Sequence, residues 1–168
     1  MTQPEIITYQ NTNIQLLAHK SELDFFDSKS MPICAQITAL KAWKVAMSKP
    51  MPILKWAFWI RDVISARFGV KKIGGFTEEF PQAVFVGDKL DFFRVEYISD
   101  DVLTLTERDK HLDVMTCISI AQNQLTITSS VKTHNLFGRL YMLPVAPAHK
   151  LIVRNTMRRI KCELLEGS

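Results

Sequence analysis

The sequence is short of the residue types and motifs that mark several large classes of protein. Cysteine occurs three times, at Cys34, Cys117 and Cys162, without the Cys-x-x-Cys spacing of a zinc or redox motif. The odd number and wide spacing exclude a disulfide framework, so we expect small buried thiols in a reducing cytoplasm. Phosphate-binding glycine loops, the dinucleotide glycine fingerprint, the Gly-x-Ser-x-Gly elbow and the His-Glu-x-x-His motif are also missing. We therefore expect no cofactor and no metal.

Long apolar runs and a strong charge are absent as well. The most apolar stretch, 51–60, contains Lys55 and is about half the roughly 20 residues that cross a bilayer. The first five residues lack the basic and apolar regions of a secretory signal. Twenty-one Lys and Arg against seventeen Asp and Glu give a net charge of only +4, with no long basic run. We expect a cytoplasmic protein that does not bind nucleic acid.

What the chain does have is the composition of one folded domain. It contains 168 residues, 47% of them hydrophobic and 23% charged, which is enough to bury a core without a metal or disulfide. We expect an N-terminal extension over 1–21 and a single domain over 22–165. Apolar spacing predicts a strand at 24–31, one helix near 33–48, a second near 52–68 that starts at Pro52, and a short strand at 83–86.

The clearest pattern lies between Leu90 and Val131. Apolar and polar residues alternate in four short segments, and each segment is separated from the next by a turn-like cluster such as 99–101 or 122–123. This pattern predicts an antiparallel meander that is apolar on one side.

The chain then returns to a helical pattern. Pro144 and Pro147 predict a short helix and a kink within 136–148. From 148 onward one face is apolar and another is basic. The apolar face consists of Val153, Met157, Ile160 and Leu164, and the basic face of Lys150, Arg154, Arg158 and Lys161. The fold class is therefore α+β, with the last helix covering the apolar face of the sheet.

Several segments together resemble a bacterial family known as domain of unknown function 2867. They are 109–113 (DKHLD), 133–141 (THNLFGRLY) and 149–154 (HKLIVR) followed by 158–159, with support from 24–28 (DFFDS), 87–88 (GD) and 56–69. The resemblance covers about 22–160, and the order of these segments carries it.

The resemblance implies a START-like helix-grip fold of the SRPBCC type, in which a curved antiparallel sheet grips a long C-terminal helix. It implies a cavity between the two, and it implies a dehydrogenase-like partner, since members of the family also occur attached to such proteins. The family has no established activity, so it supplies no catalytic residues.

Two histidines are the first candidates for a ligand site. His111 lies between Asp109 and Asp113 at a strand start, and His134 lies where the meander ends. One interpretation is that these residues orient a polar ligand or transfer a proton at the cavity rim. The other, which is more common, is that each ring is held by a carboxylate or carbonyl at a strand end.

Four further residues complete the candidate site. Arg139 and Tyr141 lie in the corner between the last strand and the helix, where Asn135 is a good N-cap, and this corner either binds an anion or only shapes the chain. Arg94 lies in a mixed aromatic and basic segment, and Trp59 lies off the apolar stripe of its predicted helix, where it would flank a pocket.

Three functions fit these observations. The first is binding of an apolar or amphipathic small molecule between sheet and C-terminal helix. The second is an enzyme that uses a His/Asp pair in that cavity. The third is an interaction module for a dehydrogenase-like partner or, through the basic helix face, for a membrane surface; such a face is more often simply solvated.

Overall fold

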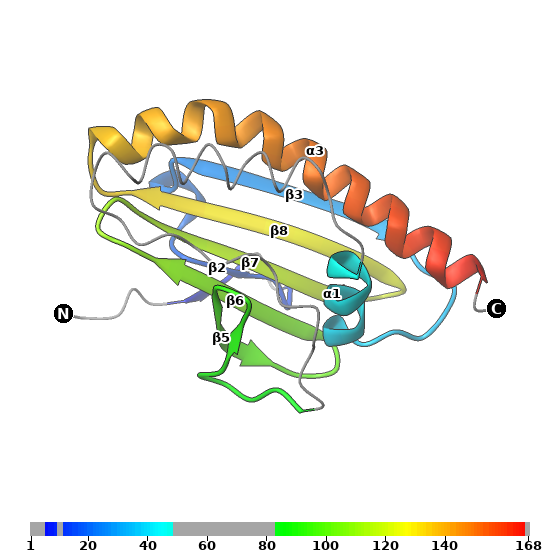
Figure 1. Ribbon diagram of the computed structural model, residues 1–168. Helices are drawn as coiled ribbons and strands as arrows, with labels where there is room; N and C mark the ends of the chain where they lie inside the picture. The colour runs from blue at the N-terminus through cyan, green and yellow to red at the C-terminus, as the bar shows by residue number, and fades with distance from the viewer. Residues whose placement is uncertain (1–5, 10–11, 49–82, 167–168) are drawn as a thin grey trace.

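The computed structural model describes residues 6–9, 12–48 and 83–166 (Figure 1). The predicted helix at 52–68, and Trp59 with it, lie outside these residues. In chain order, the elements are β1 (Ile7–Thr8), β2 (Gln15–Leu16), a 3-10 turn (Lys20–Glu22), β3 (Phe25–Pro32), α1 (Ala39–Met47), β4 (Lys89–Leu90), β5 (Phe93–Ile98), β6 (Val102–Arg108), β7 (Leu112–Ala121), β8 (Gln124–Thr133) and α3 (Leu136–Glu166).

A six-stranded antiparallel sheet forms the centre of the fold, with strand order β3-β8-β7-β6-β5-β4. The predicted meander is confirmed as β5 to β8, and the predicted strand at 24–31 is β3, which extends the sheet beside β8. The β7–β8 turn consists of Gln122 and Asn123, whose φ angles of 50° and 57° are those a two-residue hairpin turn requires. Helices α3 and α1 lie on one face of this sheet, which is the helix-grip arrangement (Figure 1).

Residue alternation in the paired strands gives the sheet two different faces. On the face toward α1 and α3, register aligns Ile127, Ile118 and Leu103 in one row across β8, β7 and β6, and all three belong to the main core. The second face is also buried, but it is rich in Ser and Thr. Its buried residues include Thr104, Thr106, Thr126, Thr128 and Ser130.

The N-terminal residues cover that second face. Leu16 and Leu17 are buried, and the backbone N–H of Leu17 donates to the Ser130 hydroxyl at 3.3 Å. The Thr104 hydroxyl donates to the side-chain oxygen of Gln15 at 2.7 Å. The hairpin of β1 and β2, which falls within the expected extension, therefore packs on the sheet.

Helix α1 confirms the prediction of a helix near 33–48 but begins later than predicted. Thr38 is in an extended conformation, and its hydroxyl accepts a hydrogen bond from the backbone N–H of Lys41 at 3.2 Å, so it is the N-cap. Ile33 and Ile37 are buried, but they lie in the irregular segment before the helix. Their spacing matched a helical repeat because both contact the core.

Helix α3 is continuous from Leu136 to Glu166, so the prediction that a short helix ends within 136–148 is wrong. Proline removes one backbone hydrogen bond and bends a helix, but it need not end it when neighbouring turns are packed. Here Met142 and Val145 pack in a hydrophobic cluster on the sheet, while both prolines are exposed. Figure 1 shows the helix arching over β3 and β8.

Two smaller predictions also need correction. Residues 83–86 are not a strand, because the Asp88 carboxylate accepts from the backbone N–H of Phe85 at 2.8 Å and holds a turn there. Of the three thiols, Cys117 is buried as expected, but Cys34 and Cys162 are exposed. Cys34 follows the edge strand β3, and Cys162 is on the solvent side of α3.

None of the helices in the described part of the chain has the length and apolar character needed to span a membrane.

Candidate functional site

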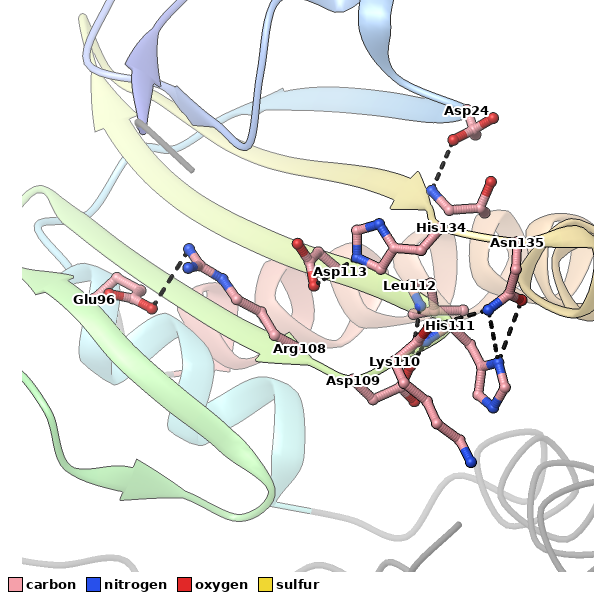
Figure 2. A network of polar contacts seen from close by, with 11 residues as sticks. Asp24, Glu96, Arg108, Asp109, Lys110, His111, Leu112, Asp113, His134 and Asn135 are labelled. Carbon is pink, nitrogen blue, oxygen red and sulfur yellow. Dashed lines mark hydrogen bonds and ion pairs between the residues drawn. The ribbon is translucent and has the colours of Figure 1, made fainter. Parts of the chain in front are cut away.

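The candidate Asp109 closes the turn between β6 and β7. Its Oδ1 atom accepts hydrogen bonds from the backbone N–H groups of His111 at 2.6 Å and Leu112 at 3.0 Å. These two bonds fix the turn that carries His111 (Figure 2). In this position the carboxylate organises the backbone around the histidine.

Asn135 joins that turn to the start of α3. Its Oδ1 accepts from the backbone N–H of Gly138 at 3.1 Å, so the predicted N-cap is confirmed. Its Nδ2 donates to the carbonyl oxygen of Lys110 at 3.0 Å and lies 3.0 Å from Nδ1 of His111. The ring of His111 also packs against the ring of Phe137 in a tilted arrangement, with 4.3 Å between ring centroids. His111 is therefore held on three sides by the corner between sheet and helix.

The backbones of His134 and His111 are in contact, but their rings are not. The backbone N–H of His134 donates to the His111 carbonyl at 2.7 Å. Its Nε2 lies 3.1 Å from Oδ1 of Asp113, so the ring pairs with a carboxylate on the strand. Figure 2 shows the two imidazoles turned in different directions. The strands thus bring the two residues together without aiming both rings at one point.

The other candidates are spread over the molecule. Arg139 is exposed near Asp24, whose pKa is lowered, chiefly by the hydrogen bond that it accepts from the Thr133 backbone and to a smaller extent by the Arg139 charge. Tyr141 packs against a small hydrophobic cluster under the helix. Arg94 is exposed on β5, where it is opposite Thr106 of β6 and Lys89 of β4.

A second group of polar residues, which the sequence analysis did not select, lies beneath α3. Register places Asp27 of β3 opposite Ser129 of β8, and Ser129 opposite Thr116 of β7, all on the face toward the helix. We call this row, together with His149 of α3, the polar belt. It separates two hydrophobic clusters, one of which includes Leu112, Val131 and Met142, and the other Ile118, Ile127, Val153 and Met157.

His149 reaches the belt from the helix. Its ring meets Phe25 edge-on, with 5.6 Å between centroids. Burial lowers the pKa of His149 to about 4; the charge of Asp27 acts in the opposite direction, and Lys29 lowers the pKa further. The imidazole is therefore neutral at pH 7 and lies in the electrostatic field of Asp27.

Three polar atoms of the belt have no hydrogen-bond partner among the residues that the structure describes. They are Oδ2 of Asp27, Oγ of Ser129 and Nε2 of His149, and each is shielded from solvent. Buried polar atoms in folded proteins are nearly always paired, so such a group calls for an explanation. Between them they offer an acceptor, a hydroxyl that donates or accepts, and a ring nitrogen.

The described residues contain no group of three or more His, Cys, Asp or Glu side chains arranged to hold a metal ion. The belt has one carboxylate and one imidazole, which suit a ligand's hydrogen-bonding group.

One signal in the sequence pointed to His149. It lies four residues before Val153 and eight before Met157, so it continues the apolar stripe of α3 toward the N-terminus of the helix. A histidine on the stripe that faces the sheet is expected to be buried. Asp27 and Ser129 carried no such signal, because each looks like an ordinary strand residue until β3 is paired with β8.

The fold and its interior define the class: an α+β helix-grip protein with a polar belt beneath its long C-terminal helix. Residues 20–156 match the family described as "Protein of unknown function (DUF2867)", and the chain belongs to that family. Asp27, Ser129 and His149 all lie within the matched range. No curated protein matches the chain.

Proposed function

We propose that this protein binds an apolar or amphipathic small molecule between the sheet and α3, with a polar group of the ligand on the polar belt. The observation that carries the proposal is the set of buried, unpaired atoms on Asp27, Ser129 and His149. An unpaired buried polar group costs about 1–3 kcal/mol of stability. A ligand group that pairs with these atoms removes part of that cost, and this gain favours binding.

The belt and its surroundings support one kind of ligand. A carboxylate and a neutral imidazole accept hydrogen bonds, and the Ser129 hydroxyl both accepts and donates. A hydroxyl or amide group matches this set. Hydrophobic clusters lie on both sides of the belt, so the remainder of the ligand is apolar. These features support an amphipathic molecule such as a long-chain alcohol.

We also propose a superfamily and a cellular compartment for the protein. A sheet gripping a long C-terminal helix is the arrangement that the START-like superfamily uses to hold apolar ligands, and we assign the chain to that superfamily on this likeness. The exposed thiols of Cys34 and Cys162 suit a reducing compartment, so we place the protein in the cytoplasm.

The test is ligand binding with a matched pair of serine variants. Ser129 and Ser130 are adjacent on β8 and equally buried, each 1% exposed, but they lie on opposite faces of the sheet. Ser129→Ala removes an unpaired hydroxyl, so it should raise the melting temperature of the free protein and weaken binding of decanol about ten-fold. Ser130→Ala removes the acceptor for Leu17, so it should lower the melting temperature and leave decanol affinity unchanged.

Two results would contradict the proposal. One is that neither native mass spectrometry nor thermal shift detects any bound alcohol, fatty acid or isoprenoid on the full chain. The other is that decanol binds but Ser129→Ala and Ser130→Ala weaken it equally, which would place the ligand away from the belt.

A second candidate function, proton transfer on the bound molecule, is favoured by the neutral His149 in the field of Asp27. This is a different His/Asp pair from the one the sequence suggested. The test is deuterium incorporation at carbon positions of the co-purified ligand in heavy water. An enzyme would speed incorporation, and His149→Gln would abolish the acceleration; no incorporation above the protein-free rate would leave binding as the function.

A further inference from the structure

A groove of about 400 Å³ runs between the edge strand β3 and the C-terminal half of α3. Both elements contribute to its walls. The lining residues are Lys29, Ser30, Met31, Arg154, Met157, Arg158 and Lys161. The groove belongs to the same sheet–helix junction as the polar belt, because Lys29 lies two residues after Asp27 on β3.

Among the described residues, every charged side chain that lines the groove is positive. The four cationic side chains come from two elements. The ion pairs found among the described residues use other cations, such as Arg108 with Glu96 and Lys132 with Glu22. Within that part of the chain, the four groove cations have no carboxylate within ion-pair distance.

The spacing on α3 concentrates this charge. Arg154 and Arg158 are four residues apart and Arg158 and Lys161 are three apart, so their side chains are neighbours on the helix surface. Like charges at these spacings repel each other and destabilise a helix. The sequence of α3 contains no acidic residue before Glu163, so nothing on the helix offsets the repulsion within the groove. A bound anion would offset this repulsion.

The floor of the groove is apolar. Met157 is 8% exposed, and both it and Met31 pack against the main hydrophobic core. Methionine side chains are flexible and polarisable and adapt to apolar groups of different shape. Cations above an apolar floor match a molecule with an anionic end and an apolar body.

We propose that this groove binds the anionic group, a phosphate or a carboxylate, of a single amphipathic molecule whose apolar part lies on Met31 and Met157. The inference rests on the proposed function and extends its ligand from a neutral amphipathic molecule, such as an alcohol, to one that carries an anionic group. Arginine holds phosphate and carboxylate by paired hydrogen bonds, and Lys29 and Lys161 add charge. The concave shape and the contribution from β3 suit one molecule rather than a flat membrane surface.

The test compares two probes of equal chain length, decyl phosphate and decanol, as monomers binding to the full chain. Decyl phosphate should bind at least ten-fold more tightly than decanol at low salt, and this advantage should shrink as salt is raised. The double variant Arg154→Glu/Arg158→Glu should remove the advantage of decyl phosphate over decanol. Arg154→Gln/Arg158→Gln should remove most of it without adding negative charge.

The matched control is Lys41→Glu/Arg139→Glu. It makes the same change in charge at exposed positions outside the groove, so it should retain most of the advantage. Equal loss in the control would show that only net charge matters and would overturn the inference. Equal binding of the two probes by the unmodified protein would overturn it too, while leaving the proposed function intact; failure of both probes would count against the proposed function as well.

Two further arms separate the sources of the anion. Inorganic phosphate alone should bind at least ten-fold more weakly than decyl phosphate, and equal affinity would overturn the role of the apolar floor. Vesicles of phosphatidylglycerol should not co-sediment the protein more than neutral vesicles do at physiological salt. Strong co-sedimentation without binding of monomeric decyl phosphate would overturn the inference in favour of a membrane surface.

Discussion

Arg159 of α3 donates a hydrogen bond from Nη1 to the backbone carbonyl oxygen of Ala46, 2.9 Å away in the last turn of α1. The carbonyls at the end of a helix have no partner within the helix. A cation at that end also interacts favourably with the helix dipole. The guanidinium therefore caps α1 and ties it to α3, so that both helices cover the same face of the sheet.

Replacement of Arg159 should loosen this tie. Arg159→Ala is expected to lower the free energy of unfolding by about 1–2 kcal/mol, because a hydrogen bond from a charged donor is lost and a carbonyl is left unpaired. Arg159→Lys should lower the free energy of unfolding by less than Arg159→Ala does. Urea denaturation measures both. Arg154→Ala, an exposed arginine on the same helix, should stay within about 0.5 kcal/mol, and an equal loss there would rule out a specific capping role.

The three cysteines should differ sharply in reactivity. Cys117 is fully buried, its sulfur accepts from the backbone N–H of Gln15 at 3.4 Å, and burial raises the pKa of its thiol. An aromatic disulfide reagent should therefore label Cys34 and Cys162 quickly in the native protein and Cys117 only after unfolding. The double variant Cys34→Ser/Cys162→Ser should show no fast phase. Rapid labelling of that variant would mean that the second face of the sheet opens readily.

Much of the fold could be predicted because its local patterns are strong. Residues alternate with a period of two in β6, β7 and β8, and the apolar stripe from Val153 to Leu164 has the period of a helix. The three strands and the helix all formed as expected. Errors arose where a local pattern competed with packing. The spacing of Ile33 and Ile37 suggested a helix, but the Thr38 cap sets its start, and the packed turns of α3 outweigh two prolines.

The candidate site was less predictable, because it depends on contacts between distant residues. Asp27 and Ser129 are far apart in sequence and meet only because β3 adds to the sheet edge next to β8. The alternation of residues within a strand does not determine which strands pair with each other. The backbones of His111 and His134 meet at one end of β7 and β8, but the directions of their rings depend on Asn135 and Asp113.

Gly138 should tolerate no side chain. A β-carbon there would overlap the carbonyl oxygen of His111 and press on Thr133, because α3 starts directly against the β6–β7 turn. Although alanine is a better helix former than glycine by about 1 kcal/mol, the contact is with backbone, which cannot easily move. Gly138→Ala should therefore lower the free energy of unfolding by about 1–3 kcal/mol, measured by chemical denaturation.

The control for this prediction is Leu140→Ala in the same helical turn. Leu140 is 57% exposed, so its truncation should change the free energy of unfolding by less than about 0.5 kcal/mol. A Gly138→Ala variant as stable as the unmodified protein would mean that the helix start can shift away from the turn.

His149 should make the stability of the protein depend on pH between about 4 and 6.5. In the unfolded chain its pKa is near 6.5, whereas burial lowers it to about 4 in the native state. Between these values the unfolded state binds more protons, so the free energy of unfolding rises with pH. The contribution of His149 to the free energy of unfolding should be fully present above pH 6.5. It should decrease as the pH falls toward 4, by on the order of 3 kcal/mol.

Urea denaturation at intervals from pH 4 to pH 7 measures this dependence, with His149→Gln compared against His19→Gln, which changes an exposed histidine. His149→Gln should flatten the curve in this range, and His19→Gln should not. The pKa of Asp24 is lowered from 3.8, so its contribution is lost only at more acidic pH and does not overlap. If His149→Gln has the same slope as the unmodified protein, the pKa of the imidazole is near 6.5 in the native state as well, and burial does not lower it.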